Sequence, residues 1–347
     1  MKYQPLSRRE MIDVIEGKGS ASRIPVLLHM WTHPRAFKER EEQVNELLAQ
    51  YPEDAQIIGV WLPDMYPGRE DDPDYSWVNY PDPNAGKTVT GLDETVIIDD
   101  WDKLDGILES FPRAEYPRLF PSNPEPDGRY RLAGWWFCLF ERFWSLRGMT
   151  NALMDFYTDP DSVHRLFRAM TDFYKGILTR GKKELNLDGF FTSDDIGTQT
   201  STFFSQDIFN EFFYPYYKEI IEHCHSLDMH FWLHTCGNIE AFIPSFIEIG
   251  LDVLHPIQKY TMDERKIAEK FGKDICIWAG FDVQQTIPWG TPEDVRREVR
   301  FMMDTYFREE GLFMFTAGNG INGDCTLPSL EALYSEAFDY GIKKAGK

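Results

Sequence analysis

Eight short apolar runs recur along the chain, and a segment of helical or polar character separates each from the next. Runs of this length, rich in Val, Ile, Leu, Phe and Trp, predict strands buried on both faces of a parallel sheet. The predicted strands are 24–28, 57–62, 131–137, 189–193, 229–233, 252–258, 275–280 and 312–317. Apolar positions at helical spacing predict helices at 6–15, 35–51, 151–186, 206–227, 239–249, 262–271, 291–310 and 328–345.

Alternation of eight strands with helices predicts an α/β fold, a closed (β/α)8 TIM barrel, rather than an open doubly wound sheet. The leading helix, with Ser7 as its N-cap, forms an N-terminal extension. We expect one domain over residues 1–347, since ~250 to more than 400 residues is usual for such barrels. Chemistry in these barrels sits at the carboxyl ends of the strands, so polar residues there are the candidates for function.

A segment rich in Pro, Asp, Gly, Tyr and Trp, residues 67–126, interrupts the pattern after the second strand. Residues 88–90 alternate weakly, like part of an edge hairpin, and 99–110 has helical spacing. We interpret 67–126 as an insertion that folds over the barrel mouth as a cap. A solvated excursion is the alternative interpretation.

The net charge of −21 comes from 36 basic and 57 acidic residues, without a basic cluster. This balance disfavours nucleic acid as a partner, and it disfavours a polyanionic substrate unless a local basic pocket overrides it. Five widely spaced cysteines, a charged N-terminus and the lack of a long apolar run predict a reduced, cytoplasmic protein without a membrane span.

A possible metal half-site follows the fifth predicted strand, in the motif His234-Thr235-Cys236-Gly237-Asn238. Residues two apart at a strand end point the same way, so His234 and Cys236 can offer nitrogen and sulfur to one cleft. The alternative is that both are ordinary core residues. Cys325, in the loop after the last strand, is the predicted third ligand, although it could equally pack under the final helix.

Three carboxylates are candidates for acid–base chemistry. Asp194 and Asp195 close the fourth strand, where one should enter the cleft and the other cap the next turn; we assign Asp194 the catalytic role. Solvated turn residues are the alternative. Glu141 follows an aromatic stretch, so burial would raise its pKa and allow proton donation, unless it forms an ion pair with Arg142 or Arg147.

Further polar and aromatic residues at strand ends predict a substrate pocket with aromatic walls and a few polar anchors. These candidate substrate-binding residues are His29, Trp31, Asp64, Tyr66, Gln258, Asp282 and Asn319.

Several motifs resemble the uroporphyrinogen decarboxylase superfamily, in its order and spacing. They are His234–Asn238, Asp194–Gln199, Gly250–Gln258, Gly280–Gln285 and Phe140–Gly148. The resemblance implies a TIM barrel. True decarboxylases of this superfamily carry an arginine-rich loop after the first strand, whereas residues 29–35 here hold one arginine, Arg35. That difference favours the other branch, the zinc-dependent methyltransferases that work with corrinoid.

Within that branch the resemblance implies zinc bound by His234 and Cys236, and a corrinoid carried by a partner protein. Members that methylate a thiol have a further cysteine where this chain has Asn319. We therefore predict an O-demethylase type of methyltransferase, which takes a methyl group from a methoxylated aromatic compound and forms a possible homodimer. A metal-free decarboxylase or lyase of the same fold and a barrel that only binds its ligand are the alternatives.

Overall fold

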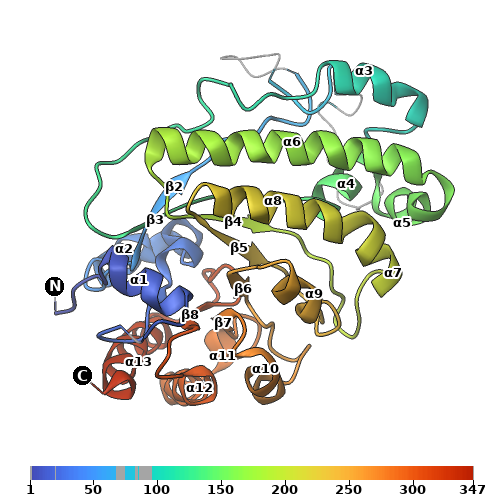
Figure 1. Ribbon diagram of the computed structural model, residues 1–347. Coiled ribbons are helices and arrows are strands. Elements are labelled where there is room, and N and C mark those ends of the chain that lie inside the picture. Colours follow the sequence, from blue (N-terminus) through green and yellow to red (C-terminus); the bar gives the residue numbers. More distant parts are fainter. Residues whose placement is uncertain (1, 20, 68–74, 83–84, 86–95, 347) are drawn as a thin grey trace.

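A computed structural model describes residues 2–19, 21–67, 75–82, 85 and 96–346. Eight parallel strands form one sheet in the order β1-β8-β7-β6-β5-β4-β3-β2, a nearly closed barrel with helices around it (Figure 1). The strands are β1 Val26–Leu27, β2 Ala55–Gly59, β3 Tyr130–Trp135, β4 Gly189–Ser193, β5 His230–His234, β6 Val253–His255, β7 Cys276–Phe281 and β8 Phe313–Ala317. The predicted TIM barrel is confirmed.

Helices connect successive strands and form the outer wall. They are α1 Arg8–Ile15, α2 Glu41–Leu48, α3 Leu104–Glu109, α4 Phe140–Arg147, α5 Met149–Thr158, α6 Pro160–Leu185, α7 Gln206–Ile208, α8 Tyr214–Ser226, α9 Ile243–Glu248, α10 Glu264–Phe271, α11 Thr286–Trp289, α12 Pro292–Tyr306 and α13 Leu327–Ala345. Short 3-10 turns lie at His29–Trp31, Pro34–Arg40 and Trp101–Lys103, and a π-helical segment, Phe209–Phe213, joins α7 to α8. No helix of the described residues is both long and apolar enough to cross a membrane.

Two departures from the predicted strand bounds have a clear physical reason. β2 begins and ends earlier than the apolar run 57–62, because the chain leaves the sheet after Gly59 and the Trp61 N–H bonds to the Leu119 carbonyl at 2.8 Å. β6 ends at His255 because Pro256, which follows, has no N–H to continue the ladder.

The barrel interior is filled largely by aromatic rings. Trp232 of β5 and Trp278 of β7 meet at 5.2 Å between ring centroids, and Trp278 lies 4.5 Å from the ring of His255. Trp31 stacks on His255 at 4.8 Å with an interplanar angle of 16°. These contacts form a continuous column that leads from the core to the mouth.

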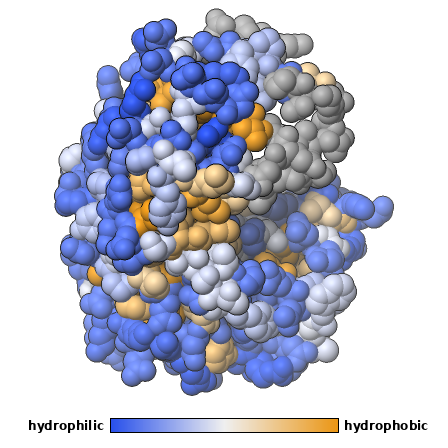
Figure 2. All heavy atoms as spheres, turned by 90° about the vertical axis from the view of Figure 1, so that its right-hand side faces the viewer, coloured by the Kyte–Doolittle hydropathy of each residue, from blue (hydrophilic) through white to orange (hydrophobic). Residues whose placement is uncertain are grey.

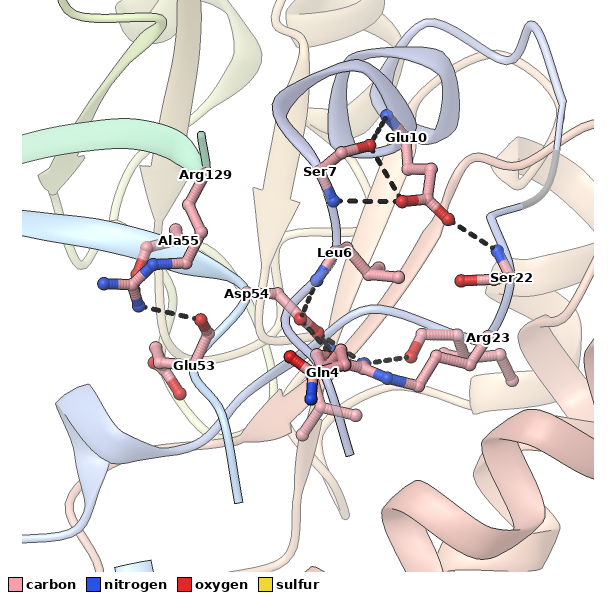
Figure 3. Close-up of polar contacts among 12 residues, drawn as sticks. Gln4, Leu6, Ser7, Glu10, Ser22, Arg23, Glu53, Asp54, Ala55 and Arg129 are labelled. Carbon is pink, nitrogen blue, oxygen red and sulfur yellow. Dashed lines mark hydrogen bonds and ion pairs between the residues drawn. The ribbon is translucent and has the colours of Figure 1, made fainter. Parts of the chain in front are cut away.

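β1 and β2 flank the one gap in the sheet, which we call the seam. Here side chains replace the missing ladder: Asp54 accepts the Val26 N–H at 2.7 Å, and Glu53 accepts the N–H groups of Leu28 and His29 at 3.1 and 3.0 Å. Arg23 forms an ion pair with Asp54 at 2.5 Å in full burial (Figure 3). The seam is therefore held by two adjacent carboxylates.

Helix α1 closes the barrel end opposite the mouth. Its capping box joins Ser7 and Glu10 through reciprocal hydrogen bonds, and Glu10 also accepts the Ser22 N–H at 3.0 Å (Figure 3). Just before β3, the Gly128 carbonyl accepts the Arg8 N–H, and just before β8 the Leu312 N–H donates to the Val14 carbonyl. The predicted N-terminal extension is thus part of the barrel floor.

The described part of the insertion packs on the outer wall. Helix α3 lies beside α6 (Figure 1), Trp77 meets Phe173 of α6 at 5.5 Å, and the predicted helix 99–110 is present as Trp101–Lys103 and α3. Residues 88–90, the predicted hairpin edge, lie outside the described residues. The cap over the mouth stays a prediction.

Candidate metal centre and active site

Three side chains converge where β4 and β5 end: Asp195, His234 and Cys236. Their oxygen, nitrogen and sulfur atoms all lie within 4.8 Å of one another. His234 Nε2 is 3.3 Å from Cys236 Sγ and 3.6 Å from Asp195 Oδ1. In the described part of the chain, this is the group of His, Cys, Asp and Glu side chains with metal-site geometry.

A close backbone contact fixes the spacing of these ligands. Gly237, at φ +88°, follows Cys236, and a Cβ added to it would lie 2.3 Å from the carbonyl carbon of Gly197. Only glycine tolerates both this conformation and this approach. The Cys236 N–H also donates to Asp195 Oδ1 at 2.7 Å. The loops after β4 and β5 are therefore joined directly at the site.

A pair of histidines sets the protonation of His234. The Ala317 carbonyl can only accept, so His255 Nε2, at 2.9 Å, donates to it. Burial lowers the pKa of both His255 and His234, so both rings are neutral. His255 Nδ1 is then an acceptor, and it receives the proton of His234 Nδ1 at 2.7 Å. His234 Nε2 is left with a free lone pair directed at the site.

Of the two adjacent aspartates, the structure places Asp195, not Asp194, in the cleft. Asp194 is fully buried, and its carboxylate accepts the N–H groups of Leu139, Phe140 and Glu141 and the Tyr217 hydroxyl. Burial raises the pKa of Asp194 to about 6. These hydrogen bonds hold the start of α4. The place in the cleft that the sequence predicted for Asp194 is therefore occupied by Asp195.

Strand alternation is the signal that could have identified Asp195. Phe191 of β4 meets Trp278 inside the barrel at 6.0 Å, so residues 191, 193 and 195 share the inner face. The sequence does not reveal whether the inward ring is Phe190 or Phe191, and this choice decides between the two aspartates.

Cys325 does not join the group, which corrects its assignment as third ligand. It is fully buried, and its thiol donates to the Thr326 carbonyl at 3.2 Å. Cys138, Cys224 and Cys276 are also buried and free. Packing under α13 explains Cys325, and Asp195 is the third donor that the structure offers.

Glu141 lies beside the triad in a buried position on α4. Its carboxylate accepts the Ser193 hydroxyl at 2.6 Å, and burial, together with the charges of Asp195 and Asp194, raises its pKa to about 8. Among the described residues it forms no ion pair with Arg142 or Arg147; Arg147 instead pairs with Asp155 at 2.6 Å. A glutamic acid in this state can give up a proton near neutral pH.

Two hollows open at the mouth, and Figure 2 shows this side of the molecule, with apolar residues in orange among hydrophilic ones in blue. The first, of about 390 Å³, contains the site side chains Glu141, Asp195 and Cys236, and we call it the polar hollow. The second, of about 840 Å³, is walled by Trp31, Trp135, Trp136, Phe137 and Phe191, and we call it the aromatic hollow. Asn319 lines both.

Four of the predicted substrate-binding residues line these hollows. Trp31 is in the aromatic hollow and stacks on His234 at 5.6 Å. Gln258 and Asp282 line the polar hollow, where Gln258 accepts the Gly237 N–H at 2.6 Å and Asp282 caps α11 by accepting three backbone N–H groups. Asn319 lies at the wall that the hollows share.

The other three candidates lie elsewhere. His29 lines a separate hollow with Glu53 and Arg129, and burial and the charge of Arg129 lower its pKa to about 4. Asp64 is exposed and bridges to Ser76, while Tyr66 packs on Tyr80 at 6.1 Å. None of these three lines the two hollows. Asp64 and Tyr66 follow β2, which ends early, and there Asp64 bonds to the insertion through its carbonyl and the Trp77 N–H.

The donor set suits zinc. One imidazole nitrogen, one thiol and one carboxylate are the ligand types that zinc takes, and three protein ligands leave a position open for chemistry. The bond from His234 to His255 supplies the outer support that a metal-binding imidazole normally has.

Comparison with known proteins agrees with this architecture. The family model "Uroporphyrinogen decarboxylase (URO-D)" matches residues 128–340, more than half of the chain. The chain belongs to the URO-D family. The match includes every residue of the triad, and it begins at the turn before β3.

Two relatives are informative. A methylated-thiol–coenzyme M methyltransferase from Methanosarcina mazei is 23% identical over 193 residues, which cover 54% of this chain and 46% of that protein. The match thus spans about half the length of that relative. A solved structure of a methyltransferase from Methanosarcina mazei covers 97% of this chain and 99% of its own, with a TM-score of 0.62 and 13% identity, and shares the fold.

Proposed function

We propose that this URO-D family protein is a zinc-containing methyltransferase that moves a methyl group from a methoxylated aromatic compound to a corrinoid on a partner protein. The Asp195–His234–Cys236 triad beside an aromatic hollow is the observation that carries the proposal. The names of the relatives, both methyltransferases, support the class of reaction.

In this proposal the triad residues hold the metal, with His234 Nε2 already deprotonated. Bound zinc would supply Lewis acidity toward the donor oxygen, and a reduced corrinoid would accept the methyl group. The aromatic hollow binds the ring and excludes water. When the bond between oxygen and methyl carbon breaks, the oxygen keeps the electron pair, and Glu141 gives its proton to that oxygen.

The ligand set favours an oxygen donor over a thiol. In the thiol-methylating branch the resemblance implies two cysteines, whereas Asn319 stands at the second cysteine position here and Asp195 supplies an oxygen. The site therefore offers one thiolate instead of two.

Methylation of a cobalt(I) corrinoid, followed by its absorption spectrum, tests the proposal. The panel is methoxyarenes, methanol, methylamines and thiols, and we expect transfer from methoxyarenes alone. The purified protein should hold close to one zinc per chain, and Cys236→Ser should lose both metal and transfer while Cys325→Ser keeps both. A metal content below ~0.5 per chain, or release of carbon dioxide from a porphyrinogen, would refute it.

A further inference from the structure

The aromatic hollow contains one buried cation, Arg142 of α4. The residue is 7% exposed and lines the hollow together with Trp136 and Phe137. The guanidinium lies 4.4 Å over the ring of Trp77 and 5.5 Å over that of Phe137. The guanidinium is thus held between a ring of the insertion and a ring that follows β3.

Arg142 lacks the acidic partner that a buried cation normally has. Across the described residues no carboxylate lies within 4.0 Å of its nitrogens, and its Nε makes no hydrogen bond. Its polar contacts are to uncharged groups, the Tyr174 hydroxyl and, from Nη1, Met65 Sδ at 3.8 Å. Two other buried arginines have such a partner: Arg23 pairs with Asp54, and Arg147 pairs with Asp155. A third, Arg131, is satisfied instead by four hydrogen bonds to carbonyl and amide oxygens, which Arg142 does not have. An arginine remains charged, so its burial without an anion is costly.

The walls of the hollow connect this cation with the triad. Trp31 and Trp136, two of its walls, lie 5.6 and 5.7 Å from the ring of His234. A volume of about 840 Å³ is in the ~300–1,000 Å³ range of small-molecule sites. A flat ring in this hollow would lie between aromatic walls, with a cation and a metal site among its neighbours.

We propose that the aromatic hollow binds its ligand as an aromatic monoanion, a methoxylated aryl carboxylate whose carboxylate pairs with Arg142. The inference rests on the proposed function and adds the charge of the donor. A carboxylate supplies the missing counterion, and charge-assisted bonds to guanidinium are strong and directional. With a net charge of −21, the protein repels polyanions in general, so one local cation selects a single carboxylate.

Equilibrium binding tests the inference without corrinoid or turnover. Tryptophan fluorescence or calorimetry on the full chain would compare 2-, 3- and 4-methoxybenzoate with their uncharged amides. We expect at least one benzoate to bind ~10- to 100-fold more tightly than its amide, the range of a charge-assisted hydrogen bond. Equal affinity for benzoate and amide in all three pairs would overturn the inference. This test needs no variant of the protein.

Arg142→Met should abolish the preference for benzoate, and Arg142→Lys should keep part of it. The exposed Arg168, which pairs with Glu219 at 2.6 Å, provides the matched control, since Arg168→Met should leave the preference unchanged. If Arg142→Met folds and still prefers benzoate, Arg142 is not the anchor. Methyl transfer from neutral methoxyarenes without a charge preference would refute this inference alone, whereas the charge preference without transfer from any donor would refute the proposed function.

Discussion

The barrel has two pairs of adjacent acidic residues in different regions: Glu53-Asp54 at the seam and Asp194-Asp195 at the mouth. In each pair one carboxylate is saturated: Asp54 by Arg23 and backbone N–H groups, and Asp194 by three N–H groups and Tyr217. The remaining acidic residue of each pair has different surroundings. Glu53 accepts two backbone N–H groups in full burial, whereas Asp195 faces an imidazole and a thiol in a solvent-accessible hollow.

At the mouth the comparison separates two neighbours: Asp194 is saturated by donors at the start of α4 and by Tyr217, whereas Asp195 lines the polar hollow. Saturation by main-chain donors marks a structural role at Asp54 and Asp194 alike. Four experiments would break or sharpen this distinction.

The largest effect is expected at the seam. Asp54→Ala leaves Arg23 buried without its partner and removes an acceptor from the N–H groups of Leu6 and Val26. Denaturant unfolding should show a loss of ~3–5 kcal/mol. Metal content per folded chain should not change, and a loss of metal would show that the seam and the mouth are coupled.

The mouth pair should separate stability from metal binding. Asp194→Asn places an amide against three N–H donors and should lower the free energy of unfolding by ~2–3 kcal/mol while zinc stays bound. Asp195→Asn should change stability by less than ~1 kcal/mol and lower zinc affinity at least ~10-fold. Competition with a chelator measures the second effect. The reverse pattern would return the cleft role to Asp194.

His255→Phe tests whether the hydrogen bond from His234 to His255 prepares His234 to bind metal. Without an acceptor for Nδ1–H, the His234 ring loses its fixed tautomer, and zinc affinity should fall ~10- to 100-fold. His255→Asn is the control, because its amide oxygen can take the place of Nδ1 and should restore part of the affinity. Equal affinities in both variants would exclude this positioning role.

The smallest effect concerns pH. Burial raises the pKa of Glu53 to about 8, so the folded state holds a proton that the unfolded state loses near pH 4.5. Stability should therefore fall as pH rises between these values, by on the order of 1–2 kcal/mol from pH 6 to 8. Glu53→Gln should make this slope shallower in thermal unfolding measured across pH, while Glu141, whose pKa is also raised to about 8, keeps contributing in the same direction. An unchanged slope in Glu53→Gln would contradict the role assigned to Glu53.

Much of the fold could be predicted from the sequence because buried parallel strands have a strong apolar pattern. The run 189–193 coincides with β4, and the run 275–280 is displaced by one residue from β7. His234 and Cys236 were found because their spacing in a strand determines that they share a face. These are local properties of the chain.

The remaining site depends on contacts that spacing does not encode. The choice of Asp195 over Asp194 depends on which phenylalanine of β4 faces inward, and the exclusion of Cys325 depends on how the last loop packs under α13. Arg142 appeared in the sequence only as an ion-pair partner for Glu141, although its surroundings prove to be aromatic. Residues far apart in the chain decide each of these outcomes.

The touching backbones of Gly197 and Gly237 have a consequence for how such a protein could be redesigned. Main-chain contact sets the distance between the two loops. The side chain of a ligand can therefore be exchanged while the backbone that carries it stays in place. Asp195→Cys would give the metal site a second thiolate and so a softer set of ligands, and Asp195→His would give it a second imidazole nitrogen. The backbone of the two loops would keep its shape in both variants. One substitution could thus retune the metal preference of the barrel and leave its architecture untouched.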